Sequence, residues 1–167
     1  MFKSKNILWK KVYDTNGKKI GMVKDIFIDI YKGNIEGIDI SNFYSFRKKN
    51  NVSSKNILSI EEAITIKKES MQCSGMRFSK LKDMEVIDLN GGIKGNVEDL
   101  LIDEVDFSIK GLIVSPGILE KLIHGKEIIL LSKARIKQDY ILYKEDSNVV
   151  LKNIRHEENK DDFNKEK

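Results

Sequence analysis

The stretch Val12-Tyr13-Asp14-Thr15-Asn16-Gly17 returns 74 residues later as Val86-Ile87-Asp88-Leu89-Asn90-Gly91. The same spacing relates Gly21-Met22-Val23-Lys24-Asp25 to Gly95-Asn96-Val97-Glu98-Asp99, and it holds without a gap as far as Ser41 and Ser115. A shared register of this length indicates two copies of one supersecondary unit, each of about 70 residues. Because units this small bury only modest cores, we expect the two copies to pack against each other.

Each copy has the pattern of β structure. Asn16-Gly17 and Asn90-Gly91 are strong hairpin signals, because both residue types tolerate a positive φ angle. Short runs of apolar and β-branched residues flank each turn, as in strands that bend around a small closed core. Glycines recur inside the predicted strands, where we expect a bulge, a bend or a close backbone contact. These glycines are Gly21 and Gly95, then Gly37 and Gly111.

We therefore predict an all-β protein of two small, mostly antiparallel β-barrels in tandem. The first barrel is expected over residues 1–70 and the second over residues 81–145, with residues 71–80 as a polar linker. In the second copy, a Pro-Gly turn is followed by apolar residues at helical spacing, which predicts a short helical segment near residues 118–123. Residues 146–167 form a charged tail, too poor in apolar residues to fold alone and expected to be largely disordered.

Composition narrows the function classes. The net charge is +4, and residues 1–74 contribute a balance of +6 from 14 Lys or Arg against 8 Asp or Glu. This mildly positive half would attract RNA or an acidic protein surface. In the whole chain, however, Lys outnumbers Arg 26 to 4, and Arg is the residue that binds phosphate groups in a bidentate geometry. No stretch approaches the roughly 18 apolar residues of a membrane span. One cysteine, Cys73, excludes an internal disulfide and a Cys-rich metal site, so we expect a cytoplasmic protein.

Repeated aspartates are the obvious candidates for a catalytic or metal-binding set. A calcium loop starting at Asp14 fails, because Lys18 and Lys19 occupy positions that need an oxygen ligand and a glycine. The aspartates are better explained as acceptors of backbone N–H groups in turns and within the barrels. No nucleophile motif, histidine cluster or phosphate loop accompanies them. We therefore expect no catalytic residue, no metal site and no cofactor. The aspartates in question are Asp14, Asp25, Asp29, Asp88, Asp99 and Asp103.

One loop of the first copy has the character of a binding site, because it is aromatic and then basic. Its rings would stack on bases or anchor a protein partner, and its cations would add charge complementarity. In the alternative interpretation, one or two of the rings close the end of the barrel and leave a solvated basic loop. The candidate partner-binding residues are Phe43, Tyr44, Phe46, Arg47, Lys48 and Lys49.

The repeated unit resembles a known family. The pattern V-x-D-x-x-G-x-x-x-G-x-V-x-D, followed by I-x-G, is similar to the PRC-barrel family, which is named after the cytoplasmic part of the photosynthetic reaction-centre H subunit. The family also includes the C-terminal domain of a ribosome-maturation factor. The resemblance covers about residues 5–68 and 79–143, and the tandem arrangement is similar to proteins of low-GC Gram-positive bacteria. The residues that match the family pattern are Val12, Asp14, Gly17, Gly21, Val23, Asp25 and Gly37, then Val86, Asp88, Gly91, Gly95, Val97, Asp99 and Gly111.

The resemblance does not by itself transfer a function, because function depends on sites rather than on folds. With no catalytic constellation in the sequence, we expect a non-enzymatic adaptor that binds an unidentified protein partner through loops at one end of its barrels. The alternative is an RNA- or ribosome-associated assembly factor that uses the basic first half. The sequence leaves the oligomeric state open.

Overall fold

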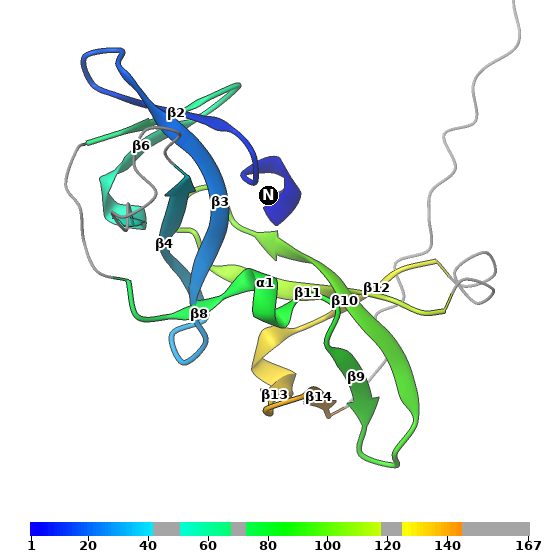
Figure 1. Ribbon diagram of the computed structural model, residues 1–167. Coiled ribbons are helices and arrows are strands. Elements are labelled where there is room, and N and C mark those ends of the chain that lie inside the picture. The colour runs from blue at the N-terminus through cyan, green and yellow to red at the C-terminus, as the bar shows by residue number, and fades with distance from the viewer. Residues whose placement is uncertain (42–50, 68–72, 118–124, 145–167) are drawn as a thin grey trace, which may run out of the picture.

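A computed structural model describes residues 1–41, 51–67, 73–117 and 125–144. The described part of the chain is mostly strand, arranged in two sheets that each curl into a barrel (Figure 1). The first barrel has the strand order β5-β4-β3-β2-β7-β6, and the second has β12-β11-β10-β9-β14-β13. The all-β, tandem-barrel prediction is therefore confirmed. The strands along the first barrel's path are β2 (Lys11–Asp14), β3 (Lys19–Asp29), β4 (Asn34–Ser41), β5 (Asn51–Ser53), β6 (Ile57–Ile60) and β7 (Ile64–Ile66).

The second barrel repeats this order, with one parallel strand pair at the same place. In the first copy Val12 of β2 lies opposite Ile64 of β7, and in the second Val86 lies opposite Ile141. The spacing between equivalent residues thus grows from 74 to 77 along the unit. The increase arises because the connection between β4 and β5 is shorter than the corresponding connection in the second copy. The strands are β9 (Glu85–Asp88), β10 (Ile93–Ile102), β11 (Ile109–Ser115), β12 (Glu127–Ile129), β13 (Ala134–Ile136) and β14 (Tyr140–Tyr143).

The repeated Asn-Gly turns join β2 to β3 and β9 to β10. Gly17 and Gly91 have φ angles of 75° and 85°, which a residue with a Cβ rarely adopts. The Asp88 side chain accepts the N–H groups of Asn90 and Gly92 at 2.8 Å, and Asp14 plays the same part in the first turn. These bonds stabilise the charged carboxylate and lower the pKa of Asp88. The expected turn-forming role of both aspartates is confirmed.

Short segments that precede each barrel are exchanged between the two barrels. β1 (Phe2–Lys3) pairs with β10 of the second barrel, and β8 (Met76–Arg77) pairs with β3 of the first. The exchange obeys the 74-residue spacing, since Phe2 lies opposite Ile102 while Met76 lies opposite Ile28. The two halves are therefore related by an approximate two-fold axis. Buried side chains of both barrels form one continuous core, as expected from the small size of each unit.

Each exchanged segment continues into one helical turn. A serine in that turn donates a hydrogen bond to a repeated aspartate of the other barrel. The Ser4 hydroxyl, in the 3₁₀ turn η1 (Ser4–Asn6), donates to the Asp99 carboxylate. The Ser79 hydroxyl, in α1 (Phe78–Leu81), donates to Asp25 at 2.5 Å. Both carboxylates also accept the N–H of the following residue in their own strand, at 2.8 Å. The expected backbone bonds are therefore present, whereas the contacts with the two serine hydroxyls could not be predicted from the sequence.

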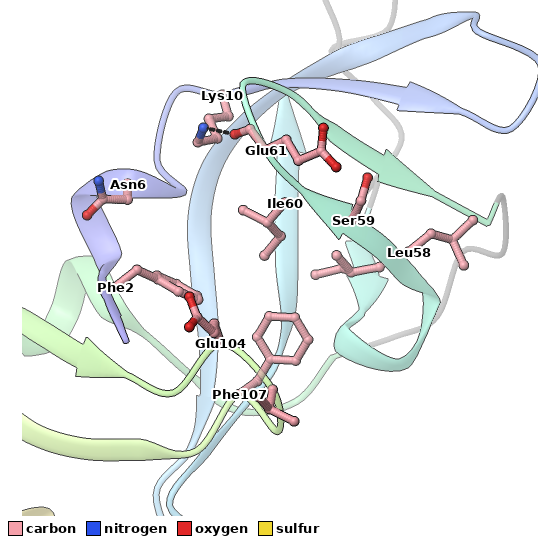
Figure 2. A pocket seen from close by; sticks show the side chains of 11 residues that line it. Phe2, Asn6, Lys10, Leu58, Ser59, Ile60, Glu61, Glu104 and Phe107 are labelled. Atoms are coloured by element: carbon pink, nitrogen blue, oxygen red, sulfur yellow. Dashed lines mark hydrogen bonds between the residues drawn. The ribbon is translucent and has the colours of Figure 1, made fainter.

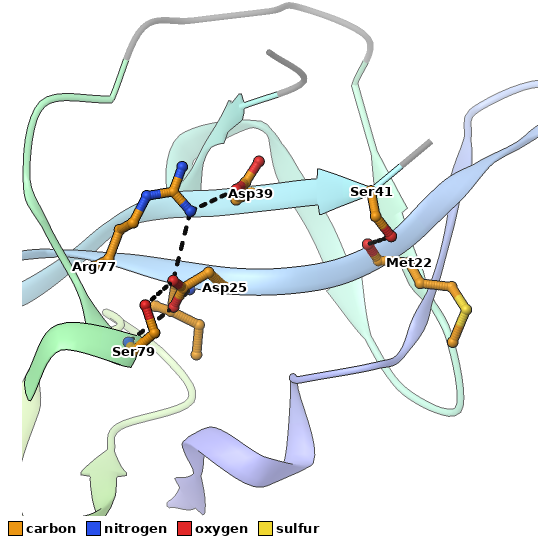
Figure 3. A network of polar contacts seen from close by, with 7 residues as sticks. Met22, Asp25, Asp39, Ser41, Arg77 and Ser79 are labelled. Atoms are coloured by element: carbon orange, nitrogen blue, oxygen red, sulfur yellow. Dashed lines mark hydrogen bonds and ion pairs between the residues drawn. The ribbon is translucent and has the colours of Figure 1, made fainter. Parts of the chain in front are cut away.

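A polar network with the first barrel fixes the segment that leads into α1 (Figure 3). The Arg77 guanidinium donates to Asp39 at 2.6 Å and lies 3.5 Å from the Asp25 carboxylate. Its carbon also lies 4.9 Å from the centre of the Phe27 ring, a cation–π contact. The hydrogen bond to Asp39 raises the pKa of Arg77 further above its usual range. Lys3 and Ile113 stand at the equivalent positions of Arg77 and Asp39 in the other half, so this ion pair has no counterpart there.

Two expectations concern helices. The segment expected at 118–123 lies outside the described residues. Within the described residues, the α-helix α1 falls instead in the stretch expected as a polar linker, where Phe78 and Leu81 are buried. The remaining short turns are 3₁₀: η2 (Ser54–Asn56) connects β5 to β6, and η3 (Leu131–Lys133) connects β12 to β13.

Candidate functional site: a groove between the two barrels

A groove of about 580 Å³ lies where the first barrel meets the start of the chain and the β10–β11 turn of the second barrel (Figure 2). Its volume falls within the range of small-molecule and peptide-side-chain pockets. Three chain segments that are distant in the sequence form its walls: the N-terminal segment, β6 and residues 104–107. The lining residues are Phe2, Asn6, Lys10, Ile57, Leu58, Ser59, Ile60, Glu61, Glu104, Val105 and Phe107.

The groove runs along the edge of β6 rather than over one face of the sheet. Side chains of a strand alternate between the two faces, so a pocket on one face is lined by every second residue. Here five consecutive residues, Ile57 to Glu61, line the groove. β6 is also the terminal strand of the first sheet path, paired with β7 on its other side. The groove therefore borders the outer edge of an end strand.

Two phenylalanines form the aromatic wall opposite β6, and Figure 2 shows both rings in the groove. The rings of Phe2 and Phe107 meet edge to face, with centroids 6.5 Å apart and an interplanar angle of 73°. Phe2 comes from the exchanged strand β1, and Phe107 comes from the second barrel. The wall therefore exists only because the two halves pack as they do.

Phe107 has an unusual backbone for its residue type. Its φ angle is 57°, in the left-handed region that favours glycine, and its equivalent in the first copy is Gly33, with a φ angle of 66°. The Phe107 carbonyl accepts the N–H of Ile35 at 3.0 Å, while the Gly33 carbonyl accepts that of Ile109 at 2.7 Å. These paired bonds across the two-fold axis hold both turns in the same conformation. The second copy thus has phenylalanine at a left-handed position where the first copy has glycine, the residue type that this backbone conformation favours.

Charged groups lie at both ends of the groove. The Lys10 ammonium donates to the main-chain carbonyl of Glu61, whose own carboxylate is exposed. The Glu104 carboxylate, 3.4 Å from the N-terminal ammonium, lies near the other end (Figure 2). The side chains that line the groove therefore carry two carboxylates and one ammonium group.

The two-fold axis relates this groove to a second one of different chemistry. Met76, Lys80 and Met84 are the equivalents of Phe2, Asn6 and Lys10, and they line a groove of about 620 Å³ together with Lys137 and Gln138. This second groove has no aromatic ring among its lining residues. One architectural feature of the repeat has therefore diverged into an aromatic, acidic version and a basic, methionine-containing version.

The loop predicted as a binding site lies between β4 and β5, after Ser41 and before Asn51. Its six candidate residues, Phe43, Tyr44, Phe46, Arg47, Lys48 and Lys49, lie outside the described residues. The site assignment therefore stays a prediction. Sequence reasoning missed the groove, although the repeat alignment held one usable signal. Phe107 stands at the position of Gly33, which ends a predicted turn.

Among the described residues, no group of three or more His, Cys, Asp or Glu side chains is placed to hold a metal ion. The thiol of Cys73 is buried beneath the first barrel, and burial, reinforced by the charges of Glu36 and Asp39, raises its pKa to about 11. A thiol in this state is a poor nucleophile at neutral pH. No helix in the described part of the chain is long and apolar enough to cross a bilayer.

Comparison with known proteins addresses the repeated unit directly. A model of the PRC-barrel domain matches residues 1–70 and, a second time, residues 74–149. No curated protein matches the chain. Because the two matches cover most of the sequence and coincide with the two barrels of the structure, the chain belongs to the PRC-barrel family and carries two copies of its domain in tandem.

Proposed function

We propose that this protein is a non-enzymatic adaptor that binds another protein through surfaces of its two barrels. The family supports this proposal, since PRC-barrel domains are a non-catalytic type of protein-interaction module. The single observation that carries it is the aromatic groove. It combines two phenylalanine rings with exposed apolar side chains, Leu58 at 57% and Val105 at 86% of full exposure. Aromatic side chains beside exposed aliphatic ones are typical of protein contact sites.

The proposal extends to the loop between β4 and β5, whose aromatic and basic residues suit the rim of a protein interface. Replacing Arg47, Lys48 and Lys49 together by Ala should reduce partner capture and leave the melting temperature nearly unchanged. Exposed charges each contribute only about 0.2–1 kcal/mol to folding. A matched control replaces the exposed Lys11, Lys18 and Lys24 by Ala, which removes the same charge from the first barrel outside both grooves. Equal capture by the loop variant and the parent chain would show that the loop is not a contact site.

Affinity purification of the tagged full chain from cell extract, repeated over a series of salt concentrations, tests the adaptor function itself. An interaction anchored by apolar and aromatic groups should persist as salt rises, whereas binding to RNA phosphates should weaken steeply. Nuclease treatment of the extract provides the control. Capture that disappears with both salt and nuclease would replace the adaptor by an RNA-binding protein, and a chain that captures no protein at all would overturn the proposal.

A further inference from the structure

We propose that the groove along β6 binds an extended segment of a partner protein as an added β-strand, and that this segment carries alternating apolar residues together with lysine or arginine. This inference rests on the proposed adaptor function and deepens it, since it names the surface and the chemistry of the partner.

The strand edge decides the conformation of the partner. All four residues of β6 and the following Glu61 line the groove, and β6 pairs with β7 on its other side. An edge of this kind offers N–H and C=O groups to an incoming extended chain, as in other interactions formed by β-strand addition. Alternate side chains of the added strand would then point toward the rings of Phe2 and Phe107, where Ile60 also faces the groove (Figure 2). A strand with alternating apolar residues matches this arrangement.

Phe107 gives an independent reason to regard the groove as functional. A bulky residue in the left-handed region is strained, and such strain persists where the surroundings enforce it and often where a site uses it. Gly33 shows that the same turn forms with glycine, so the turn does not need the phenylalanine. Phenylalanine at this position therefore costs backbone strain, and it places a ring against Phe2 and along the groove.

The charges decide the composition of the partner. Glu61 and Glu104 line the groove, where Lys10 donates to a main-chain carbonyl and the N-terminal ammonium lies 3.4 Å from the Glu104 carboxylate. The two cations offset the two carboxylates, so a phosphate backbone meets no excess of positive charge here, whereas a lysine or arginine side chain meets the exposed carboxylate of Glu61. The groove thus favours a basic peptide over a nucleic acid, although the whole chain is basic.

The test uses the full chain and synthetic peptides. One peptide alternates lysine with valine, a second alternates glutamate with valine, and a third is the lysine peptide with N-methylated backbone amides at its valines. Binding is measured by fluorescence polarisation and mapped by the backbone amide NMR signals of residues 57–61. The lysine peptide should shift these signals and bind at least about tenfold more tightly than the other two, a difference of about 1.4 kcal/mol.

Two variants assign the binding to the groove. Phe107→Gly keeps the left-handed turn and removes the ring, so it should fold like the parent chain and lose about tenfold or more in affinity for the lysine peptide. Tyr31→Ala is the control, because Tyr31 is a fully exposed aromatic residue on the corresponding turn of the first copy and should bind like the parent. Glu61→Gln together with Glu104→Gln should narrow the preference for the lysine peptide over the glutamate peptide.

The outcomes separate this inference from the adaptor function. If no peptide shifts the β6 signals, or if Phe107→Gly binds as the parent does, then the groove is not a strand-addition site. An adaptor that captures the same proteins with and without the Phe107 ring would remain an adaptor with its contact surface elsewhere. Concentration-dependent dimers of the full chain that Phe107→Gly abolishes would assign the groove to a second copy and overturn the proposal of a separate partner.

Discussion

At the scale of single residues, one carboxylate position has the same two tasks in both copies. Asp25 and Asp99 each accept an N–H in their own barrel and a serine hydroxyl from the segment that belongs to the other. Both carboxylates are buried, but Asp25 also accepts the Ser79 N–H at 3.2 Å and lies 3.5 Å from the Arg77 guanidinium. Without the Ser4 hydroxyl, the buried Asp99 carboxylate keeps the Leu100 N–H and loses a donor that water cannot readily replace, so the two hydroxyls should differ in their contribution to stability.

Replacing Ser4 by Ala should lower the free energy of unfolding by about 1–3 kcal/mol, since the buried Asp99 carboxylate loses a donor. Ser79→Ala is the matched control, and it should lower stability by less than about 1 kcal/mol because Asp25 keeps the N–H groups of Ile26 and Ser79 and the nearby guanidinium of Arg77. Urea denaturation of both variants and the parent measures the difference. Equal losses would mean that the hydroxyl at position 4 has no special part in joining the halves.

Cys73 predicts a pH dependence. Its thiol has a pKa raised to about 11 by burial and by Glu36 and Asp39, against about 9 for a free thiol. Between these values the unfolded chain has lost its thiol proton while the folded chain keeps it, so the unfolded state binds fewer protons. Stability attributable to this group is therefore complete below about pH 9 and falls as the pH rises towards about 11.

Cys73→Ala isolates this effect, because tyrosine and lysine side chains titrate over the same range in both proteins. The parent chain should lose more stability than the variant between pH 9 and 11, measured by urea unfolding in matched buffers. Parallel stability curves for the two proteins would show that the thiol is not perturbed by folding.

At the scale of elements, each barrel depends on a bulge followed by a glycine. The pairing of β2 with β3 skips Ile20, directly before Gly21, and the pairing of β9 with β10 skips Lys94, directly before Gly95. A Cβ at Gly21 would overlap the Ser41 carbonyl oxygen of β4. The bulge bends β3 while the missing side chain lets β4 approach, and both features are needed to curl a sheet this small.

Gly21→Ala should therefore lower the free energy of unfolding by about 3 kcal/mol or more, because backbone must move to make room. Gly17→Ala provides the comparison. Its turn has open space around the position but a positive φ angle, so the expected loss is only about 1–2 kcal/mol. Chemical denaturation measures the free energy of unfolding of both variants. If Gly21→Ala is as stable as Gly17→Ala, then β4 does not pack closely against position 21.

The elements also show what the sequence can and cannot predict. The hairpins, the glycine contacts and the strand at Ile109–Ser115 follow from local signals that act within one copy. β1 and β8 could not be predicted, because two-residue strands carry no periodicity and their partners lie in the other barrel. The groove was missed for the same reason. Its walls come from three distant segments, and only the replacement of Gly33 by Phe107 in the repeat marks it in the sequence.

At the scale of the whole molecule, the exchange of β1 and β8 makes the two barrels depend on each other. A chain cut in the link between β7 and β8 would give one fragment with β1 but without β8, and another with β8 but without β1. Each fragment would expose the edge of its longest strand, β3 or β10, and part of the common core. The tandem arrangement therefore acts as an intramolecular dimer of PRC-barrel domains.

Fragments 1–72 and 73–167, expressed separately, should each lack a cooperative thermal transition, and their mixture should regain one. The parent chain should unfold in a single transition seen alike by circular dichroism and by Trp9 fluorescence, because one continuous core spans both halves. The mixture should form a one-to-one complex whose stability rises with protein concentration, as linkage requires for an association that favours the folded state. A fragment that melts cooperatively alone, near the temperature of the parent, would show that its barrel is an independent domain. The exchanged strands would then serve only to set the orientation of the two barrels, and with it the shape of the groove between them.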